Sequence, residues 1–153
     1  MQYEFVVEIE EEGDRRIHLN FPKTAFLDFG LISEKISANN GKMPTVYGFL
    51  KGVINNDEEN NNKEYVDAFL VHTGSKLKSE DKAFVRVVGM FTREDGDHKV
   101  LVSEVENTEI KEFADVSEEL QKKLLEFHGF NKKIIKINSA AEAAEYLSRC
   151  EKE

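Results

Sequence analysis

Two groups of acidic residues have the types and spacing that could hold a hard metal ion. In the first, Glu64 and Asp67 follow Asn62 at the end of an Asn-rich loop, and extended-chain alternation puts Asn62 and Glu64 on one face. In the second, Asp95 and Asp97 flank a glycine in the turn REDGDHK. Carboxylate oxygens suit Mg²⁺. Both groups also have a plain structural explanation, since acidic chains carry many carboxylates and Asp-Gly is a common hairpin turn.

Two further side chains could meet a phosphate oxygen. Lys99 follows the acidic turn at a suitable distance, and the hydroxyl of Tyr47 stands beside Gly48 in TVYGF, although aromatic–Gly–aromatic strands are more often packing devices. The four histidines lack H-x-x-x-H and H-E-x-x-H spacing, and there is no Gly-rich phosphate loop or G-x-S-x-G. The sequence therefore offers no zinc site and no candidate nucleophile.

Short apolar runs separated by turn residues predict the strands that position these groups. The expected strands span residues 3–9, 16–21, 24–32, 45–54, 65–71, 83–91 and 100–105. The first two are predicted to form a hairpin across EEEGD. Gly48 and Gly52 would permit bulges or a close backbone approach.

The last third of the sequence changes to helical spacing. A helix is expected in SEELQKKLLEFHGF, with Asp115 or Ser117 as N-cap, and a short strand KKIIKI follows. A second helix, SAAEAAEYL, begins with a capping box of Ser139 and Glu142 and carries a narrow alanine stripe. Strands followed by two helices predict an α+β fold, a small closed OB-like β-barrel with two C-terminal helices packed on it.

Length and composition narrow the possible partners. The 153 residues predict a single domain spanning 1–153. Acidic residues exceed basic ones by 30 to 21, and the net charge of −9 argues against nucleic acid and anionic membranes as partners. The lone Cys150 excludes a disulfide framework. The start at Met1 has no leader-like pattern and no apolar run reaches membrane-spanning length, so we expect a cytoplasmic protein.

Taken in order over nearly the whole chain, these pieces resemble the soluble inorganic pyrophosphatases. That family has Y-G-F, then D-x-D-P-x-D, then V-R-P-x-G, an acidic turn with a lysine, and a terminal Tyr-Lys pair. Positions that match or stand in for its reactive residues are Glu8, Arg16, Tyr47, Asp67, Asp95, Asp97 and Lys99. Glu64 replaces the second aspartate of the signature and Asn62 the first.

Several family positions carry a different residue. His18 stands for a glutamate, Phe29 for the phosphate-binding arginine, and Val46 for the asparagine before Tyr-Gly. His128 and Gly129 stand for the terminal Tyr-Lys pair. Each change removes a charge or a donor from the surroundings of the diphosphate. At Phe29 an arginine could be restored, unless the side chain has become part of the core.

The resemblance implies hydrolysis of inorganic diphosphate to phosphate with Mg²⁺, or Mn²⁺, as cofactor. Glu64 would be the catalytic base. The implied metal ligands are Asp67, Asp95, Asp97 and Glu8, and the implied phosphate-binding residues are Arg16, Tyr47 and Lys99. It also implies a homo-oligomer, for which the second helix with Tyr146 is a candidate surface, although packing on its own barrel is the commoner use of such a helix. The replaced positions leave an alternative, a catalytically inactive binding or assembly protein with this fold.

Overall fold

The computed structural model describes residues 1–20, 22–57, 63–71, 76–129 and 134–153. The strands are β1 (Tyr3–Ile9), β2 (Arg15–Leu19), β3 (Phe26–Leu31), β4 (Val46–Ile54), β5 (Tyr65–Leu70), β6 (Lys82–Arg93), β7 (Lys99–Glu104), β8 (Ile134–Asn138) and β9 (Glu151–Lys152). The α-helices are α1 (Glu118–Gly129) and α2 (Ala140–Arg149). Short 3-10 turns span Ile32–Glu34, Ala38–Gly41 and Phe113–Asp115.

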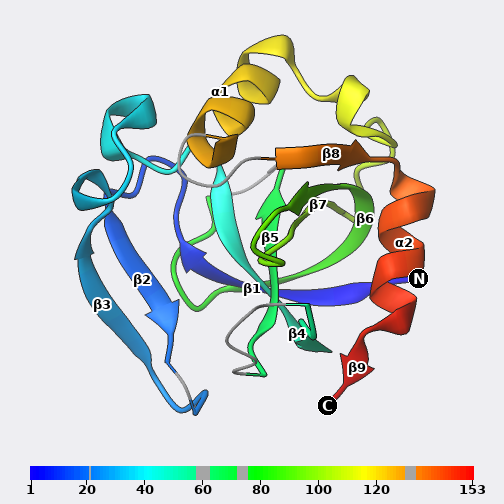
Figure 1. Cartoon of the computed structure of the whole chain (residues 1–153), viewed down its shortest axis with the longest axis horizontal. Coiled ribbons are helices and arrows are strands. Elements are labelled where there is room, and N and C mark those ends of the chain that lie inside the picture. Colours follow the sequence, from blue (N-terminus) through cyan, green and yellow to red (C-terminus); the bar gives the residue numbers. More distant parts are fainter. Residues whose placement is uncertain (21, 58–62, 72–75, 130–133) are drawn as a thin grey trace.

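A closed β-barrel forms the centre of the molecule (Figure 1). Its strands pair in the order β1-β4-β5-β7-β6, and β6 returns to pair with β1. Every one of these pairings is antiparallel except that of β5 with β7, which is parallel. The strand β8 extends the sheet from β6, and β9 pairs with β4. The predicted OB-like barrel with two C-terminal helices is confirmed.

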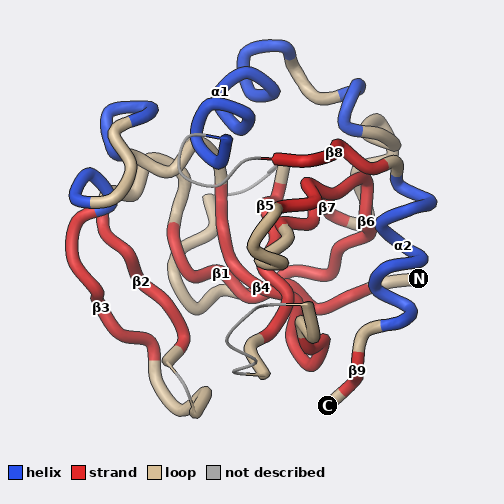
Figure 2. Tube along the Cα trace, viewed as in Figure 1, coloured by secondary structure: helices blue, strands red, loops and turns tan. Residues whose placement is uncertain are grey.

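The predicted hairpin of the first two strands is wrong. β1 pairs with β4 and β6, whereas β2 pairs with β3 in a separate two-stranded sheet beside the barrel (Figure 2). The reason is burial. Phe5 and Val7 of β1 are fully buried in the core of the barrel, where the two edges of β1 pair with β4 and β6, whereas β2 is polar and half-buried. The predicted end of β2 at Phe21 lies outside the described residues.

Two apolar clusters lie on opposite faces of the barrel strands, as period-2 alternation requires. On β5, Leu70 belongs to the cluster that contains Leu147 of α2, and Phe69 belongs to the cluster that contains Leu124 of α1. The barrel strands are thus buried on both faces, as their nearly continuous apolar sequence predicts. Each helix covers one cluster.

The helix α2 packs on its own barrel. Its capping box is confirmed, because Ser139 and Glu142 exchange side-chain-to-backbone hydrogen bonds. The buried stripe contains Ala143 and Tyr146, whereas Ala144 is exposed and so does not belong to it. Tyr146 is therefore unavailable as part of an assembly surface.

Gly48 and Gly52 let β4 fit its neighbours. A Cβ on Gly48 would lie 1.9 Å from the carbonyl oxygen of Val6 on β1, so only glycine permits this strand approach. Gly52 has a φ of +80°, and the register of β4 with β5 shifts between Phe49 and Ile54. The expectation of a close approach and a bulge is confirmed.

The strand β8 lies at one end of the sheet. Within the described residues it pairs with β6 alone, and it exposes Ile135 (60%) and Ile137 (44%). Lys136 lies between them and its Nζ donates to Glu142 Oε2 at 2.5 Å.

Among the described residues, no helix combines the length and apolar character that crossing a bilayer requires.

Candidate functional site

The acidic turn between β6 and β7 is built by its own sequence. Gly96 has a φ of +76°, a conformation that glycine adopts without strain. The carboxylate of Asp95 accepts a hydrogen bond from the backbone N–H of Asp97 at 3.1 Å. From outside the turn, the side chain of Asn55 donates to the Gly96 carbonyl at 3.0 Å. The turn is thus fixed before any ligand arrives.

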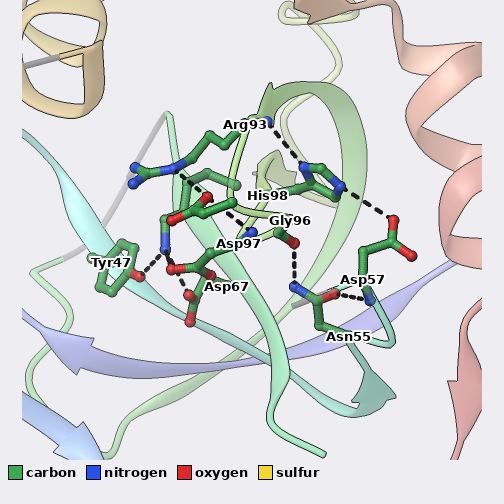
Figure 3. Close-up of polar contacts among 10 residues, drawn as sticks. Tyr47, Asn55, Asp57, Asp67, Arg93, Gly96, Asp97 and His98 are labelled. Carbon is green, nitrogen blue, oxygen red and sulfur yellow. Dashed lines mark hydrogen bonds and ion pairs between the residues drawn. The ribbon is translucent and has the colours of Figure 1, made fainter. Parts of the chain in front are cut away.

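His98 holds the turn from the other side (Figure 3). Its Nδ1 accepts a hydrogen bond from the backbone N–H of Arg93 at 3.0 Å, so Nε2 carries the hydrogen and faces Asp57 Oδ2 at 3.2 Å. The His98 ring also packs edge-on against Tyr146, with centroids 5.4 Å apart. This network orients the residues on both sides of His98, which are Asp97 and Lys99.

The ammonium group of Lys99 is the centre of the site. Its Nζ lies 2.7 Å from Asp67 Oδ2, 2.9 Å from Asp97 Oδ2 and 3.0 Å from the hydroxyl of Tyr47. Lys99 is only 3% exposed. Asp67 and Lys99 are register partners in the parallel pair β5–β7, which explains how they meet. Figure 3 shows Tyr47, Asp67 and Asp97 pointing toward one another.

Burial and charge set the protonation of this group. Burial raises the pKa of Asp67 well above its usual range, which the Lys99 ammonium only partly opposes. Burial would also raise the pKa of Asp97, but Lys99 and the hydrogen bonds from Asp67 and Lys99 hold it below its usual range. Burial would lower the pKa of Lys99, yet the two aspartates keep it above its ordinary value. The ion pair Lys99–Asp97 is therefore charged at neutral pH, with Asp67 shifted toward its neutral acid.

A cleft of about 720 Å³ opens above this group, between the barrel and the sheet of β2 and β3. Five basic and four acidic side chains line it, although the whole chain carries 21 basic and 30 acidic residues. The basic ones are Arg16, Lys23, Lys35, Arg93 and Lys99, and the acidic ones are Glu8, Glu64, Asp67 and Asp97. The cleft is thus less acidic than the rest of the molecule.

The structure brings seven of the eight predicted site residues to this cleft, namely Glu8, Arg16, Tyr47, Glu64, Asp67, Asp97 and Lys99. The eighth, Asp95, does not line it, and its Oδ1 faces Arg93 Nε at 3.4 Å instead. Asn62 and the side chain of His128 lie outside the described residues. The chemical roles of the eight residues stay predictions.

Glu8 connects the barrel to the β2–β3 sheet. Its Oε2 accepts a hydrogen bond from the backbone N–H of Leu19 at 2.7 Å, and its Oε1 lies 3.5 Å from His18 Nδ1. Glu8 is buried, so these contacts fix the position of β2 relative to β1. The residue that replaces a family glutamate, His18, is thus a neighbour of this carboxylate.

Phe29 lines the cleft and is not part of the core. It is 46% exposed, and on the same face of β3 Leu27 is 45% exposed and also lines the cleft. The alternative in which Phe29 has become a core residue is wrong. Where the resemblance places a phosphate-binding arginine, this chain has an exposed aromatic ring.

Three basic residues of the cleft, Lys23, Lys35 and Arg93, were not foreseen from the sequence. Lys23 lies between β2 and β3 and Lys35 follows a 3-10 turn, so both are distant in sequence from the acidic groups. Arg93 ends β6 and is the first residue of the turn REDGDHK. For Arg93 the available signal was its place in that turn, two residues before Asp95, and the alternation of β6, because Arg93 is two residues beyond the buried Phe91. Their arrival at the cleft depends on tertiary structure.

The carboxylates are chemically suited to Mg²⁺, but their arrangement does not fit it. Among the described residues, no three His, Cys, Asp or Glu side chains form a group that could hold a metal ion. Asp67 and Asp97 face the Lys99 ammonium, Asp95 faces Arg93, and Glu8 anchors β2. A lysine cation stands where a divalent cation would have to bridge two carboxylates.

Comparisons with known proteins identify the fold. No protein-family model matches the sequence, and a comparison with curated proteins gives no match. Solved structures do match. An inorganic pyrophosphatase from Thermus thermophilus superposes with a TM-score of 0.78 and 18% identity over 97% of this chain and 88% of that one. An inorganic pyrophosphatase from Neisseria gonorrhoeae superposes with a TM-score of 0.75 and 20% identity over 95% of this chain and 86% of that one. One from Coxiella burnetii superposes with a TM-score of 0.77 and 17% identity over 97% of this chain and 92% of that one. The chain therefore has the fold of the inorganic pyrophosphatases.

Proposed function

We propose that this chain binds a diphosphate group in the cleft and does not hydrolyse inorganic diphosphate at an enzymatic rate. The observation that carries the proposal is the ion-paired Lys99. Its ammonium neutralises Asp97 and contacts Asp67, so the carboxylates do not repel an anion as a bare acidic cluster would. Arg16, half-buried on β2, lines the same cleft and makes no ion pair with a described residue.

The ligand contacts follow from the donors that face the cleft. Arg16 supplies a planar guanidinium that suits two phosphate oxygens at once. The hydroxyl of Tyr47 stands beside Lys99 and is kept protonated, because burial raises the pKa of Tyr47 well above its usual range. It can therefore donate a hydrogen bond to an anion at any physiological pH.

A second candidate function, slow Mg²⁺-dependent hydrolysis, rests on one specific observation. Glu64, the base that the resemblance implies, is exposed and lines the same cleft as Asp67 and Asp97. When bound, Mg²⁺ supplies charge neutralisation and an acidified water in such reactions. This function requires the Lys99 ammonium to leave both aspartates, and Phe29 gives no charge to a departing phosphate.

We propose a cytoplasmic site of action for either function, in keeping with the unpaired, buried Cys150.

Calorimetric titration of the full chain with inorganic diphosphate, with and without Mg²⁺, tests the proposal. We expect binding without metal, and we expect Arg16→Gln to weaken it by at least about tenfold, because a charged hydrogen bond contributes on the order of 1.5–3 kcal/mol. The matched control is Lys122→Gln, which removes an exposed cation of α1 outside the cleft. Absence of binding to the unaltered chain would show that the proposal is wrong.

A phosphate-release assay with Mg²⁺ or Mn²⁺ separates the two functions. We expect no release above background from the unaltered chain and the same result from Glu64→Gln. If the unaltered chain releases phosphate and Glu64→Gln abolishes that release while diphosphate still binds, the hydrolytic function holds instead. A rise of the melting temperature at millimolar metal would favour the same conclusion.

A further inference from the structure

One wall of the cleft is apolar and exposed. Leu27 and Phe29 are separated by one residue on β3, so they share a face, and both line the cleft. Asp28 between them points away and pairs with Arg15 at 2.5 Å. The strand thus turns its charged side to solvent and its apolar side to the cleft. Single exposed apolar residues are ordinary, but two side by side in a concave site suggest an apolar ligand group.

The aromatic surface is continuous from this wall to the charged floor. The rings of His18 and Phe29 have centroids 6.1 Å apart, and the rings of His18 and Tyr47 are also 6.1 Å apart. The hydroxyl of Tyr47 in turn contacts the Lys99 ammonium. A ligand that reaches from Lys99 to Phe29 would therefore meet cations and donors at one end and aromatic faces at the other.

The size of the cleft fits a larger ligand than inorganic diphosphate. Its volume of about 720 Å³ lies within the range of roughly 300–1,000 Å³ that is typical of sites for organic ligands. Inorganic diphosphate is small and polar throughout, so it would leave Leu27 and Phe29 in contact with water. An attached planar group would cover them, and stacking on aromatic side chains is a common way to bind such groups.

We infer that the cleft takes organic diphosphates that carry a planar aromatic group, such as nucleoside diphosphates. This inference rests on the proposed function, since Arg16 and Tyr47, beside the Lys99 ion pair, bind the diphosphate end. It adds that Leu27 and Phe29 determine specificity by packing on the aromatic end. The residue that stands for the family's arginine has thus exchanged a contact to phosphate for a contact to the remainder of the ligand.

The test compares ADP, inorganic diphosphate and adenosine by calorimetric titration of the full chain without metal. We expect ADP to bind at least tenfold more tightly than either of the other two. Phe29→Ala and Leu27→Ala should each weaken ADP about tenfold and leave diphosphate unchanged. Leu31→Ala is the matched control, because Leu31 is an exposed leucine of the same strand outside the cleft. Circular dichroism checks that each variant is folded.

The outcomes separate this inference from the proposed function. Equal affinity for ADP and diphosphate, unchanged by Phe29→Ala, overturns the inference and leaves the proposed function standing. If neither ADP nor diphosphate binds, both the inference and the proposed function are wrong. Light scattering is measured on the same samples. If Phe29→Ala dissociates an oligomer without changing ADP affinity, the apolar wall is an interface between copies and the inference is wrong.

Discussion

Lys99 connects three strands through one charged atom, and its removal should be costly. Tyr47 is on β4, Asp67 is on β5, and Lys99 itself begins β7. We expect Lys99→Met to lower the free energy of unfolding by about 3–5 kcal/mol, because it leaves buried acidic groups without their cation. Urea-induced unfolding measures this change.

The same variant tests whether the lysine occupies a cation position. Without the ammonium, Asp67 and Asp97 face a space in which Mg²⁺ or Mn²⁺ can lie, so millimolar metal should restore part of the lost stability of Lys99→Met and add none to the unaltered chain. The control is Lys122→Met, whose ammonium forms an exposed pair on α1. Equal metal effects on all three chains would contradict this account.

At the residue scale the sequence predicted part of the site. The sequence placed Asp97 and Lys99 at one turn, with a metal ion and a phosphate oxygen as their expected contacts, and the ion pair between them was not predicted. The arrival of Asp67 depends on the parallel pairing of β5 with β7, which no local pattern reveals. The sequence alone shows Phe29 at the position where the pyrophosphatase family has an arginine, but only the structure shows that the ring faces a cleft and not the core.

At the element scale, the capping box of α2 should make stability depend on pH. The side-chain hydrogen bond from Lys136, helped by the backbone N–H of Ser139, holds the pKa of Glu142 below its ordinary value of 4.5. When the pKa of a carboxyl is lower in the folded chain than in the unfolded chain, its charge stabilises the fold at any pH above the unfolded-state pKa. This stability is lost as the pH falls through the folded-state pKa. The cap should therefore weaken below about pH 4.5.

Unfolding titrations from pH 7 to pH 3 check this expectation. Glu142→Gln should be less stable than the unaltered chain at pH 7, and the difference should shrink as the pH falls below 4.5. Glu145→Gln serves as a comparison, because Glu145 is exposed on the same helix but pairs with Arg149 outside the cap. A difference between Glu142→Gln and the unaltered chain that is constant over the whole range would show that the carboxylate charge is not responsible.

The sequence predicted the helices and strands more reliably than it predicted which strands pair with each other. Alternation and capping signals are local, so they located β1, β4 and α2 to within two residues at each end. Strand pairing depends on which edges compete for a neighbour, and a polar turn such as EEEGD serves equally as a hairpin or as an exit from the barrel. The error at β2 is of this kind. Ser117 rather than Asp115 caps α1, because Asp115 bonds the backbone of Lys111 and Glu112.

At the scale of the whole molecule, the resemblance predicts a homo-oligomer, and closed symmetry is the usual form of such assemblies. The structure removes Tyr146 from the candidate surfaces, because that side chain is buried between α2 and its own barrel, where its hydroxyl donates to Asn55. We expect light scattering at micromolar concentration to give a mass that is a small multiple of 17.5 kDa. A mass of one chain over the whole concentration range would refute the expectation.

The position of β8 at the end of the sheet also bears on how the protein behaves when concentrated. Closure protects the barrel strands from edge-to-edge aggregation, but in the described part of the chain β8 has a free outer edge beside two exposed isoleucines, Ile135 and Ile137. Lys136 between them is the kind of gatekeeper charge that interrupts an aggregation-prone stretch. An apolar residue at position 136 would leave an uninterrupted apolar edge, onto which further copies could add strand by strand.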